Sequence, residues 1–597
     1  MSTLALAAPP APTTTKSWRI ARATSLVGVS VLLCALGLLA PKAAVAQHNN
    51  LPEHQAYALQ LYQALVGEMA AYQGDVNSAY RFLMEAATNS GDPRLYERAV
   101  AVAVESGSGP LAWQAASTWG NAQPNSIEAQ RAILRVALAI GREPGITSGL
   151  TNLLRLSPEA SRLELIRATP ATLQRLPPNS DVDAERVLTV ALAPFANKPA
   201  TAAAVKAAIG FVQLGADKPQ KALQSARQAF EADDTDTEGA RLALALLEQG
   251  ITAGEPLVLA HLHRNPQSTR VRFGYARSLY DDHRTRQALA QVQRVVADEP
   301  DYTPAWLLLG RLRLETNALQ QAQDIALRAF NLSQKETPPG AQVTQTQALY
   351  LLSDVALAKQ EWQAAASWLD QADSPDNANT VLYKRAVLQG KRGYIAQGYA
   401  LLDNMAQDSE QALRLKLLTK AQWLREFEQF AKAYNVLTDL NKRFPDDANL
   451  LYEQAMMADK LGQSADMERL LRLVMTVQPD YHHAYNALGY SFADKGERLP
   501  EAKALIEKAL EFAPNDPYII DSLGWVYFRL GDLGQAQDVL RKAYSIKADG
   551  EIAAHLGEVL WADNQREAAI TLWREALTRH TDNDTLRNTM LRFGIAP

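Results

Sequence analysis

Small side chains recur along this sequence at a spacing close to 34 residues. Ala502, Ala536 and Ala569 are 34 and 33 residues apart, and a glycine precedes each of them by 12 or 13 residues. These glycines are Gly489, Gly524 and Gly557. The apolar residues between them follow helical spacing, which predicts two helices per copy. A period of about 20–50 residues is typical of arrays in which one helical unit stacks on the next.

Gly524 explains why the small residues recur. Glycine costs a helix interior about 1 kcal/mol relative to alanine. Helix axes normally lie about 8–10 Å apart, and small contact residues allow a closer approach. We therefore expect Gly524 to face Ala536 within one helical hairpin, and Ala543 to allow the next hairpin to pack closely. Burial of the neighbouring apolar side chains, at about 1.5–3 kcal/mol each, would offset the cost of the glycine. They are Leu523, Val526, Val539 and Leu540.

Helix ends are also marked in this copy. Gly531 can take the left-handed conformation that ends a helix. Asn515 or Asp516 can cap the following helix, with Pro517 suited to its first turn.

Copies of the pattern extend from residue 203 to residue 590. Second-helix positions 34 residues apart are Ala288 with Ala322 and Ala433 with Met467, and Ala365 with Gly398 are 33 apart. This helix–turn–helix period resembles the tetratricopeptide repeat (TPR) family, most clearly over residues 303–332 and 521–544. The resemblance implies an all-α fold, a right-handed superhelix (α-solenoid) of stacked helix-turn-helix repeats.

The repeat pattern divides the chain into segments. Prolines interrupt the periodicity before residue 200, and Ala322 and Ala365 are 43 residues apart rather than 34. We therefore expect a signal peptide over 1–46, a degenerate N-terminal helical-repeat arm over 47–200, a first TPR segment over 201–333, a break or loop over 334–345, a second TPR segment over 346–590 and a tail over 591–597.

The N-terminus has the pattern of an export signal. Basic residues precede an apolar run over 24–40, and Ala44 and Ala46 form the small-x-small motif of a signal-peptidase site. The 17-residue run is shorter than the roughly 20 residues of a membrane-spanning helix, so we expect cleavage after Ala46 and export to the periplasm. If cleavage failed, the run would hold the chain at the membrane. Cys34 is the only cysteine, so the cleaved chain would have none, which suits an oxidising compartment.

No motif for chemistry accompanies the repeats. The sequence lacks HExxH, a glycine-rich phosphate loop and GxSxG, so we expect no catalytic residues, no metal and no cofactor. His261 and His263 lie two apart, on different faces of a helix. The net charge of −5 gives no reason to expect nucleic-acid binding. We expect a protein that is not an enzyme; a site hidden in the N-terminal arm is the least favoured alternative.

The family resemblance also implies a binding surface. In TPR proteins the first helix of each repeat lines the concave face, at positions 6 and 3 before the small residue and 1, 4 and 5 after it. In the three C-terminal repeats the candidate partner-binding residues at these positions are His483, Asn486, Tyr490, Asp494, Tyr518, Asp521, Trp525, Phe528, Arg529, Glu558 and Trp561, with Ala493, Glu551, Ala554 and Ala562 at the others. Tyrosine, tryptophan and arginine dominate protein-binding hot spots. The alternative is that Trp525, Phe528 and Trp561 only pack between adjacent first helices.

These expectations favour an exported, non-catalytic scaffold that binds other envelope proteins or peptides. The Lys/Asn clamp with which some TPR proteins hold a carboxyl terminus is missing. Residues 486–577 further resemble large proteobacterial envelope TPR proteins, a group that includes the lipoprotein adaptor of a periplasmic carboxyl-terminal processing protease. That resemblance implies delivery of substrates to the protease, or its activation. Here Leu33 precedes Cys34, so the lipoprotein signal is absent. The alternative is a structural subunit of a polysaccharide or protein export machine.

Overall fold

The computed structural model describes residues 53–596 apart from 178, 234, 338–339 and 581–582. Regular structure in this part of the chain is entirely helical. Contacts between residues divide the chain into two units, unit 1 (Met1–Thr316) and unit 2 (Asn317–Pro597). The expected signal peptide, with Ala44 and Ala46, lies outside the described residues.

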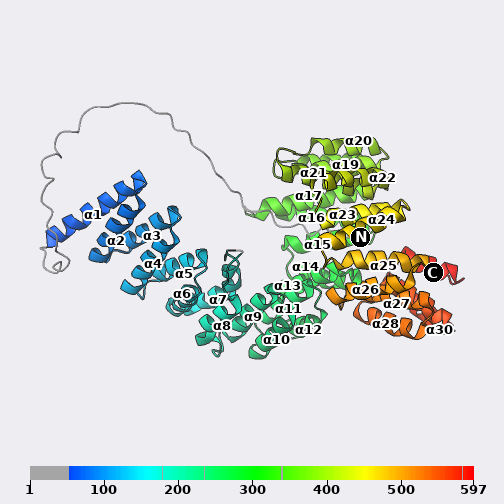
Figure 1. Cartoon of the computed structure of the whole chain (residues 1–597), viewed down its shortest axis with the longest axis horizontal. Coiled ribbons are helices and arrows are strands. Elements are labelled where there is room, and N and C mark those ends of the chain that lie inside the picture. The colour runs from blue at the N-terminus through cyan, green and yellow to red at the C-terminus, as the bar shows by residue number, and fades with distance from the viewer. Residues whose placement is uncertain (1–52, 178, 234, 338–339, 581–582, 597) are drawn as a thin grey trace. The chain divides into compact units, whose positions relative to one another are not determined.

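Unit 1 is a series of helices in which each packs against the next in the chain (Figure 1). Short 3₁₀ helices η1 (Ala193–Phe195) and η2 (Thr252–Gly254) interrupt the series. The α-helices are α1 (Glu53–Gln73), α2 (Val76–Ser90), α3 (Pro93–Glu105), α4 (Gly109–Ala122), α5 (Ile127–Ala139), α6 (Glu143–Leu156), α7 (Glu159–Leu173), α8 (Ala184–Leu192), α9 (Ala202–Gly215), α10 (Pro219–Ala232), α11 (Glu238–Glu248), α12 (Glu255–Arg264), α13 (Thr269–Asp281), α14 (Thr285–Asp298) and α15 (Thr303–Glu315).

Unit 2 has the same architecture, and its helices from α22 to α30 are each 13 or 14 residues long. One 3₁₀ helix, η3 (Leu402–Asn404), follows α20. The α-helices are α16 (Leu319–Ser333), α17 (Gly340–Ala358), α18 (Trp362–Ala372), α19 (Ala378–Lys391), α20 (Ile395–Leu401), α21 (Glu410–Glu426), α22 (Phe430–Arg443), α23 (Ala448–Lys460), α24 (Ser464–Val477), α25 (His482–Lys495), α26 (Leu499–Phe512), α27 (Pro517–Leu530), α28 (Leu533–Ile546), α29 (Gly550–Ala562), α30 (Arg566–Arg579) and α31 (Asp584–Arg592).

The all-α fold of stacked helix-turn-helix repeats is confirmed in each unit. The interruption predicted over 334–345 is shorter than expected, because α17 already begins at Gly340. The division between the two units falls after Thr316, ahead of that interruption. The remaining segment boundaries stay predictions. No helix of the described residues is both long and apolar enough to span a membrane.

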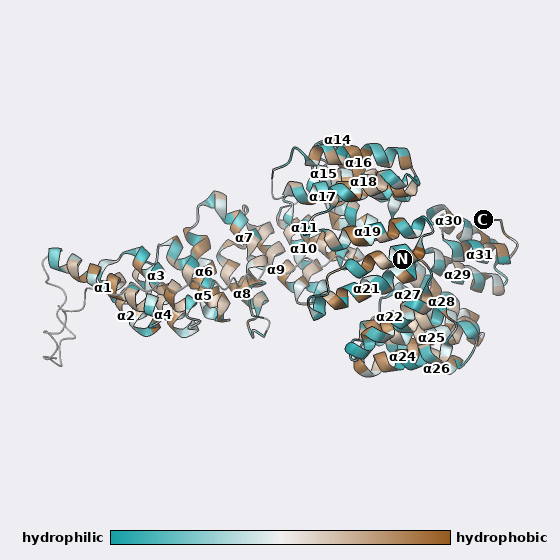
Figure 2. Cartoon of the chain, turned by 90° about the horizontal axis from the view of Figure 1, so that it is seen from above, coloured by the Kyte–Doolittle hydropathy of each residue, from teal (hydrophilic) through white to brown (hydrophobic). Residues whose placement is uncertain are grey.

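The small residues lie at helix contacts, as predicted, but the nearest neighbour of Gly524 is Leu540 rather than the predicted Ala536. Ala536 and Ala543 are completely buried. A Cβ added to Gly524 would lie 2.5 Å from Cγ of Leu540 on α28, so no larger residue fits unless that side chain moves. A Cβ added to Gly557 on α29 would lie still closer to its neighbour, the indole ring of Trp573 on α30. Polar and apolar residues are mixed along the helices (Figure 2), and the buried apolar ones form the contacts between hairpins.

The predicted helix ends are also present. Gly531 has a φ of 87° and ends α27, while the Asp516 carboxylate accepts hydrogen bonds from the backbone N–H groups of Tyr518 and Ile519. The sequence of a single repeat is therefore sufficient to begin and end its first helix.

Replacing Gly557 by alanine tests the close helix contact. We expect Gly557→Ala to lower the free energy of unfolding by about 1–3 kcal/mol, because the rigid, buried Trp573 ring must be displaced. Urea denaturation followed by circular dichroism measures the change. Gly534→Ala is the matched control, since its Cβ would meet only Asp532 Oδ1, at 3.8 Å. It should raise stability by about 0.5 kcal/mol. Equal effects of the two substitutions would contradict the packing argument.

Candidate partner-binding surface

The predicted wall residues lie on helices that pack side by side in unit 2. Helix α25 contacts α27, α27 contacts α29, and α29 contacts α31. Tyr490, Asp521, Trp525 and Glu558 thereby come together from three successive repeats. We call the eleven predicted positions on α25, α27 and α29 the C-terminal wall.

His555 lies at the centre of the C-terminal wall, although the positional rule did not select it. Its Nδ1 is 2.8 Å from Oδ2 of Asp521, and its ring stacks on Trp525 with 4.4 Å between ring centroids and 25° between planes. The Tyr490 ring lies 6.2 Å away. His555 follows Asp521 by 34 residues, one repeat period, and this spacing of an ionisable pair is the sequence signal that would have found it.

Carboxylates control the protonation of this cluster. Burial alone disfavours the imidazolium, but the negative charge of Asp521, its hydrogen bond, and the charges of Glu558 and Glu551 raise the pKa of His555 above its ordinary value. Burial also raises the pKa of the Tyr490 phenol, and the surrounding carboxylates act in the same direction. The raised pKa of His555 favours its protonated form beside Asp521, and Tyr490 keeps its proton.

The wall continues onto α31 through Glu558. Its carboxylate accepts a hydrogen bond from Nη2 of Arg592 and lies 3.4 Å from the Thr589 hydroxyl. Beside this pair, Trp561 stacks on Trp573 with a centroid distance of 5.9 Å. Helix α31 therefore contributes a charge partner to the last predicted wall position.

Exposure separates the predicted residues into two groups. Asp521, Trp525 and Glu558 are buried by neighbouring helices, with Trp525 only 7 % exposed. His483, Asp494 and Tyr518 are exposed, and Asn486, Tyr490, Phe528, Arg529 and Trp561 are half-buried. The buried group shapes the wall, as the packing alternative expects for Trp525, while the other residues are accessible. Partner binding by the wall stays a prediction.

Three buried polar atoms of the C-terminal wall are unsatisfied. Within the described residues, Asp521 Oδ1, Trp525 Nε1 and Asn486 Oδ1 have no hydrogen-bond partner. A buried polar atom without a partner costs about 1–3 kcal/mol. The wall thus retains hydrogen-bonding capacity that the hairpins themselves do not use.

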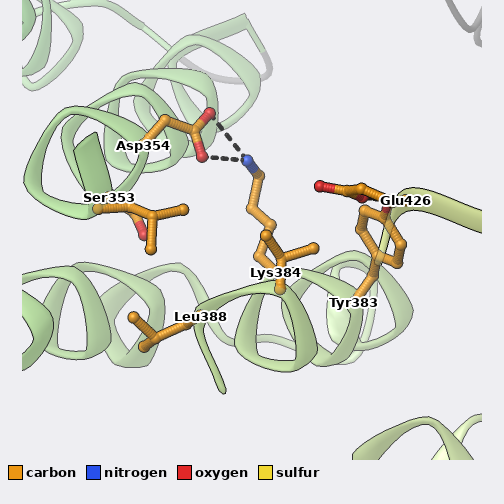
Figure 3. Close-up of a pocket in the computed structure, with 8 residues that line it drawn as sticks. Ser353, Asp354, Tyr383, Lys384, Leu388 and Glu426 are labelled. Atoms are coloured by element: carbon orange, nitrogen blue, oxygen red, sulfur yellow. Dashed lines mark hydrogen bonds and ion pairs between the residues drawn. The ribbon is translucent and has the colours of Figure 1, made fainter. Parts of the chain in front are cut away.

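A hollow of about 150 Å³ lies among α17, α19 and α21, the first helices of earlier repeats in unit 2. Nζ of Lys384 contacts both carboxylate oxygens of Asp354, at 2.7 and 2.9 Å, and the Tyr383 hydroxyl donates to Glu426 over 2.8 Å (Figure 3). Burial and the Glu426 charge raise the pKa of Tyr383, so its hydroxyl remains a donor. We call this the Lys384 hollow; its lining residues are Ser353, Asp354, Leu357, Tyr383, Lys384, Val387, Leu388 and Glu426.

The Lys384 hollow follows the same positional rule as the C-terminal wall. The small-residue positions on these helices are Ser353, Ala386 and Ala421, each twelve residues before a second-helix position. Ser353 lies beside the second-helix position of its own repeat, because its hydroxyl donates a hydrogen bond to the Ala365 carbonyl over 3.1 Å. Counting from these positions, the rule selects fifteen residues, of which five line the hollow: Asp354, Leu357, Tyr383, Val387 and Glu426. Ser353, Lys384 and Leu388 line it at positions that the rule does not select. The sequence reasoning missed the five selected residues only because it applied the rule to the last three repeats.

Comparison with known proteins identifies the repeats. Sequence profiles described as "Tetratricopeptide repeat" match residues 273–335 and 519–549. The chain contains tetratricopeptide repeats over these residues. Tetratricopeptide repeats are units of protein–protein interaction, so the repeats fit a protein-binding scaffold, which stays a prediction for this chain. The expected absence of catalysis stays a prediction.

Curated relatives match parts of this TPR chain. "TPR repeat-containing protein PA4667" of Pseudomonas aeruginosa is 40% identical over 169 residues, 28% of each chain. "Cellulose synthase operon protein C" of Pseudomonas fluorescens is 25% identical over 333 residues, 48% of this chain and 26% of the relative. The matches thus span little more than a quarter of these two relatives. "TPR repeat-containing protein YpiA" of Bacillus subtilis is 22% identical, over 65% of this chain and 98% of the relative.

Solved structures of TPR proteins also match parts of the chain. A thermophilic TPR protein of Thermus thermophilus is 20% identical with a TM-score of 0.28, covering 30% of this chain and 97% of that structure. A TPR protein of Parabacteroides merdae is 15% identical with a TM-score of 0.32, covering 41% and 97%.

The His555–Asp521 pair makes stability depend on pH. The folded-state pKa of His555 is raised above its unfolded value of about 6.5, so the pair stabilises the fold below that pH and is lost as pH rises through the folded value. Asp521→Asn should therefore lower the urea midpoint most at about pH 6 and least at about pH 9. Urea titrations of both proteins across this range measure the difference. A difference that does not change with pH would contradict the assignment of the charged pair.

Proposed function

We propose that this protein is an exported TPR scaffold that binds other envelope proteins along its first helices in unit 2. The observation that carries the proposal is the recurrence of aromatic and charged residues at one set of repeat positions. These positions line the Lys384 hollow and form the C-terminal wall. A surface that recurs from repeat to repeat suits an extended polypeptide, which offers side chains at regular intervals.

The Lys384 hollow suits a single side chain of a partner. Its volume of about 150 Å³ is too small for most drug-sized ligands, whose pockets measure about 300–1,000 Å³. Lys384 and Glu426 offer a donor and an acceptor at its rim, while Leu357 and Val387 offer apolar contact. The C-terminal wall adds the accessible side chains of Tyr490, Phe528 and Trp561.

Export to the periplasm is part of the proposal. It is supported by the basic residues ahead of the apolar run at 24–40 and by the Ala44–Ala46 motif. In that compartment the scaffold would hold a carboxyl-terminal processing protease and its substrates on one surface. Joint binding raises their effective concentration without catalysis by the scaffold itself. The partners are proteins or peptides rather than nucleic acid.

A second candidate function is a structural subunit of a polysaccharide export machine. The match to "Cellulose synthase operon protein C" over 48% of this chain favours it. Under this alternative the protein would co-purify with a synthase or a membrane pore rather than with a protease.

Photo-crosslinking tests which surface meets the partner. A photoreactive amino acid replaces Tyr518 in the C-terminal wall or Glu426 in the Lys384 hollow, both exposed positions. We expect both probes to crosslink the same envelope protein in living cells, because one extended partner would pass both places. Mass spectrometry of the crosslinked product identifies it and separates protease from synthase or pore.

The matched control is a probe at Tyr394, which also lies in unit 2 and is 47 % exposed against 41 % for Tyr518. It lies at the start of α20, a second helix, and should capture nothing specific. Equal capture by all three probes, or capture by Tyr394 alone, would overturn the assignment of the binding surface.

A further inference from the structure

Helix α1 exposes a stripe of large apolar side chains. All six are at least 54 % exposed, and Tyr72 is 95 % exposed. Successive residues of an α-helix turn by about 100°, so the six lie within an arc of about 140° on one side of α1. We call them the α1 stripe; they are Tyr57, Leu61, Tyr62, Leu65, Met69 and Tyr72.

The opposite side of α1 is already occupied by α2. Gln63, Gly67 and Ala70 are buried there, and a Cβ on Gly67 would lie 2.7 Å from Cγ of Leu83. Packing against α2 therefore leaves the α1 stripe uncovered. An exposed apolar patch of this size normally marks an interaction site.

The other terminal helix of the described chain behaves differently. Terminal units of repeat arrays need a polar outer face for solubility. On α31 the exposed residues are Asp584, Thr585, Asn588, Leu591 and Arg592, with a single large apolar side chain among them. The α1 stripe lacks this polar character, which marks it as an interaction surface rather than an end cap.

The α1 stripe carries almost no charge of its own that could attract a charged partner. Glu68, near one edge of the arc, is the ionised residue nearest to it on α1, and Arg98 pairs with it at 2.7 Å. From residue 54 to residue 67 the helix carries no Asp, Glu, Lys or Arg. The surface therefore matches another uncharged apolar helix.

We propose that the α1 stripe binds the α1 stripe of a second copy of this chain. In an antiparallel pair with Leu65 on the two-fold axis, Leu61 faces Met69, because each lies four residues from Leu65. Tyr57 and Tyr72, eight and seven residues away, meet at the ends. A two-fold interface requires this self-complementarity.

The exposed area suits an interface. An aromatic side chain buries about 150–250 Å², so the three tyrosines alone expose roughly 400 Å². Monomeric proteins rarely expose apolar patches above a few hundred Å², and a stable interface buries about 800 Å² on each partner. The α1 stripe supplies a large share of that area from one helix.

Sedimentation equilibrium of the protein, purified as its host processes it, tests the proposal. We expect a dimer at micromolar concentration, and the double variant Leu61→Glu, Leu65→Glu should raise the dissociation constant by at least about 100-fold, since it places charges in an apolar contact. Val190→Glu, at a position on α8 that is 56 % exposed, is the matched control and should leave the dimer intact. Unchanged thermal unfolding of the diluted variants would show that they fold.

Disulfide trapping tests the register. In a Cys34→Ser background, Leu65→Cys should form a covalent dimer on mild oxidation, and Val190→Cys should not. A wild-type protein that remains monomeric would overturn the proposal, whether residues 1–52 or another protein covers the stripe. A dimer that survives the two glutamates, or that Leu65→Cys does not trap, would overturn it as well.

Discussion

Close contact between the two helices of each hairpin is the constraint on which this structure depends. Gly524 against Leu540 and Gly557 against Trp573 show how little space the hairpins leave at that contact. Because the approach is so close, the large apolar residues around it are buried on both helices, and each hairpin presents its first helix to the next hairpin in the same orientation. The recurrence of one set of surface positions in every repeat follows from this contact.

Side-chain interactions between neighbouring repeats add specificity to the stack. His555 with Asp521 and Arg592 with Glu558 are each 34 residues apart, and Lys384 with Asp354 is 30 apart. Each pair joins the first helix of one repeat to the next first helix along the chain. Such pairs orient successive hairpins, and where they lie near the surface they also supply the charges of the candidate binding site.

The repeat could be predicted from the sequence because it depends on side-chain size. Ala536 and Ala543 are buried, and Gly531 and Asp516 end and begin helices, because one spacing and a few backbone preferences determine these features. His555 was missed because it lies two residues before Gly557, a position that the rule does not include. The α1 stripe was missed for another reason: periodicity identifies a packed face but gives no information on whether the opposite face is covered. Whether the C-terminal wall binds a partner depends also on the partner molecule. The sequence of this chain carries no information about that molecule.

Each hairpin touches only its neighbours, and this limits how strongly any one of them is held. An internal hairpin must lose two interfaces to open, whereas the last one, α29 with α30 and the helix α31 behind it, loses fewer. Amide protons at the C-terminal end should therefore exchange with solvent sooner than those in the middle of unit 2. The Arg592–Glu558 pair is the side-chain contact that opposes this fraying, since it connects α31 to α29. A stack built in this way can loosen at one end without losing the order of its interior.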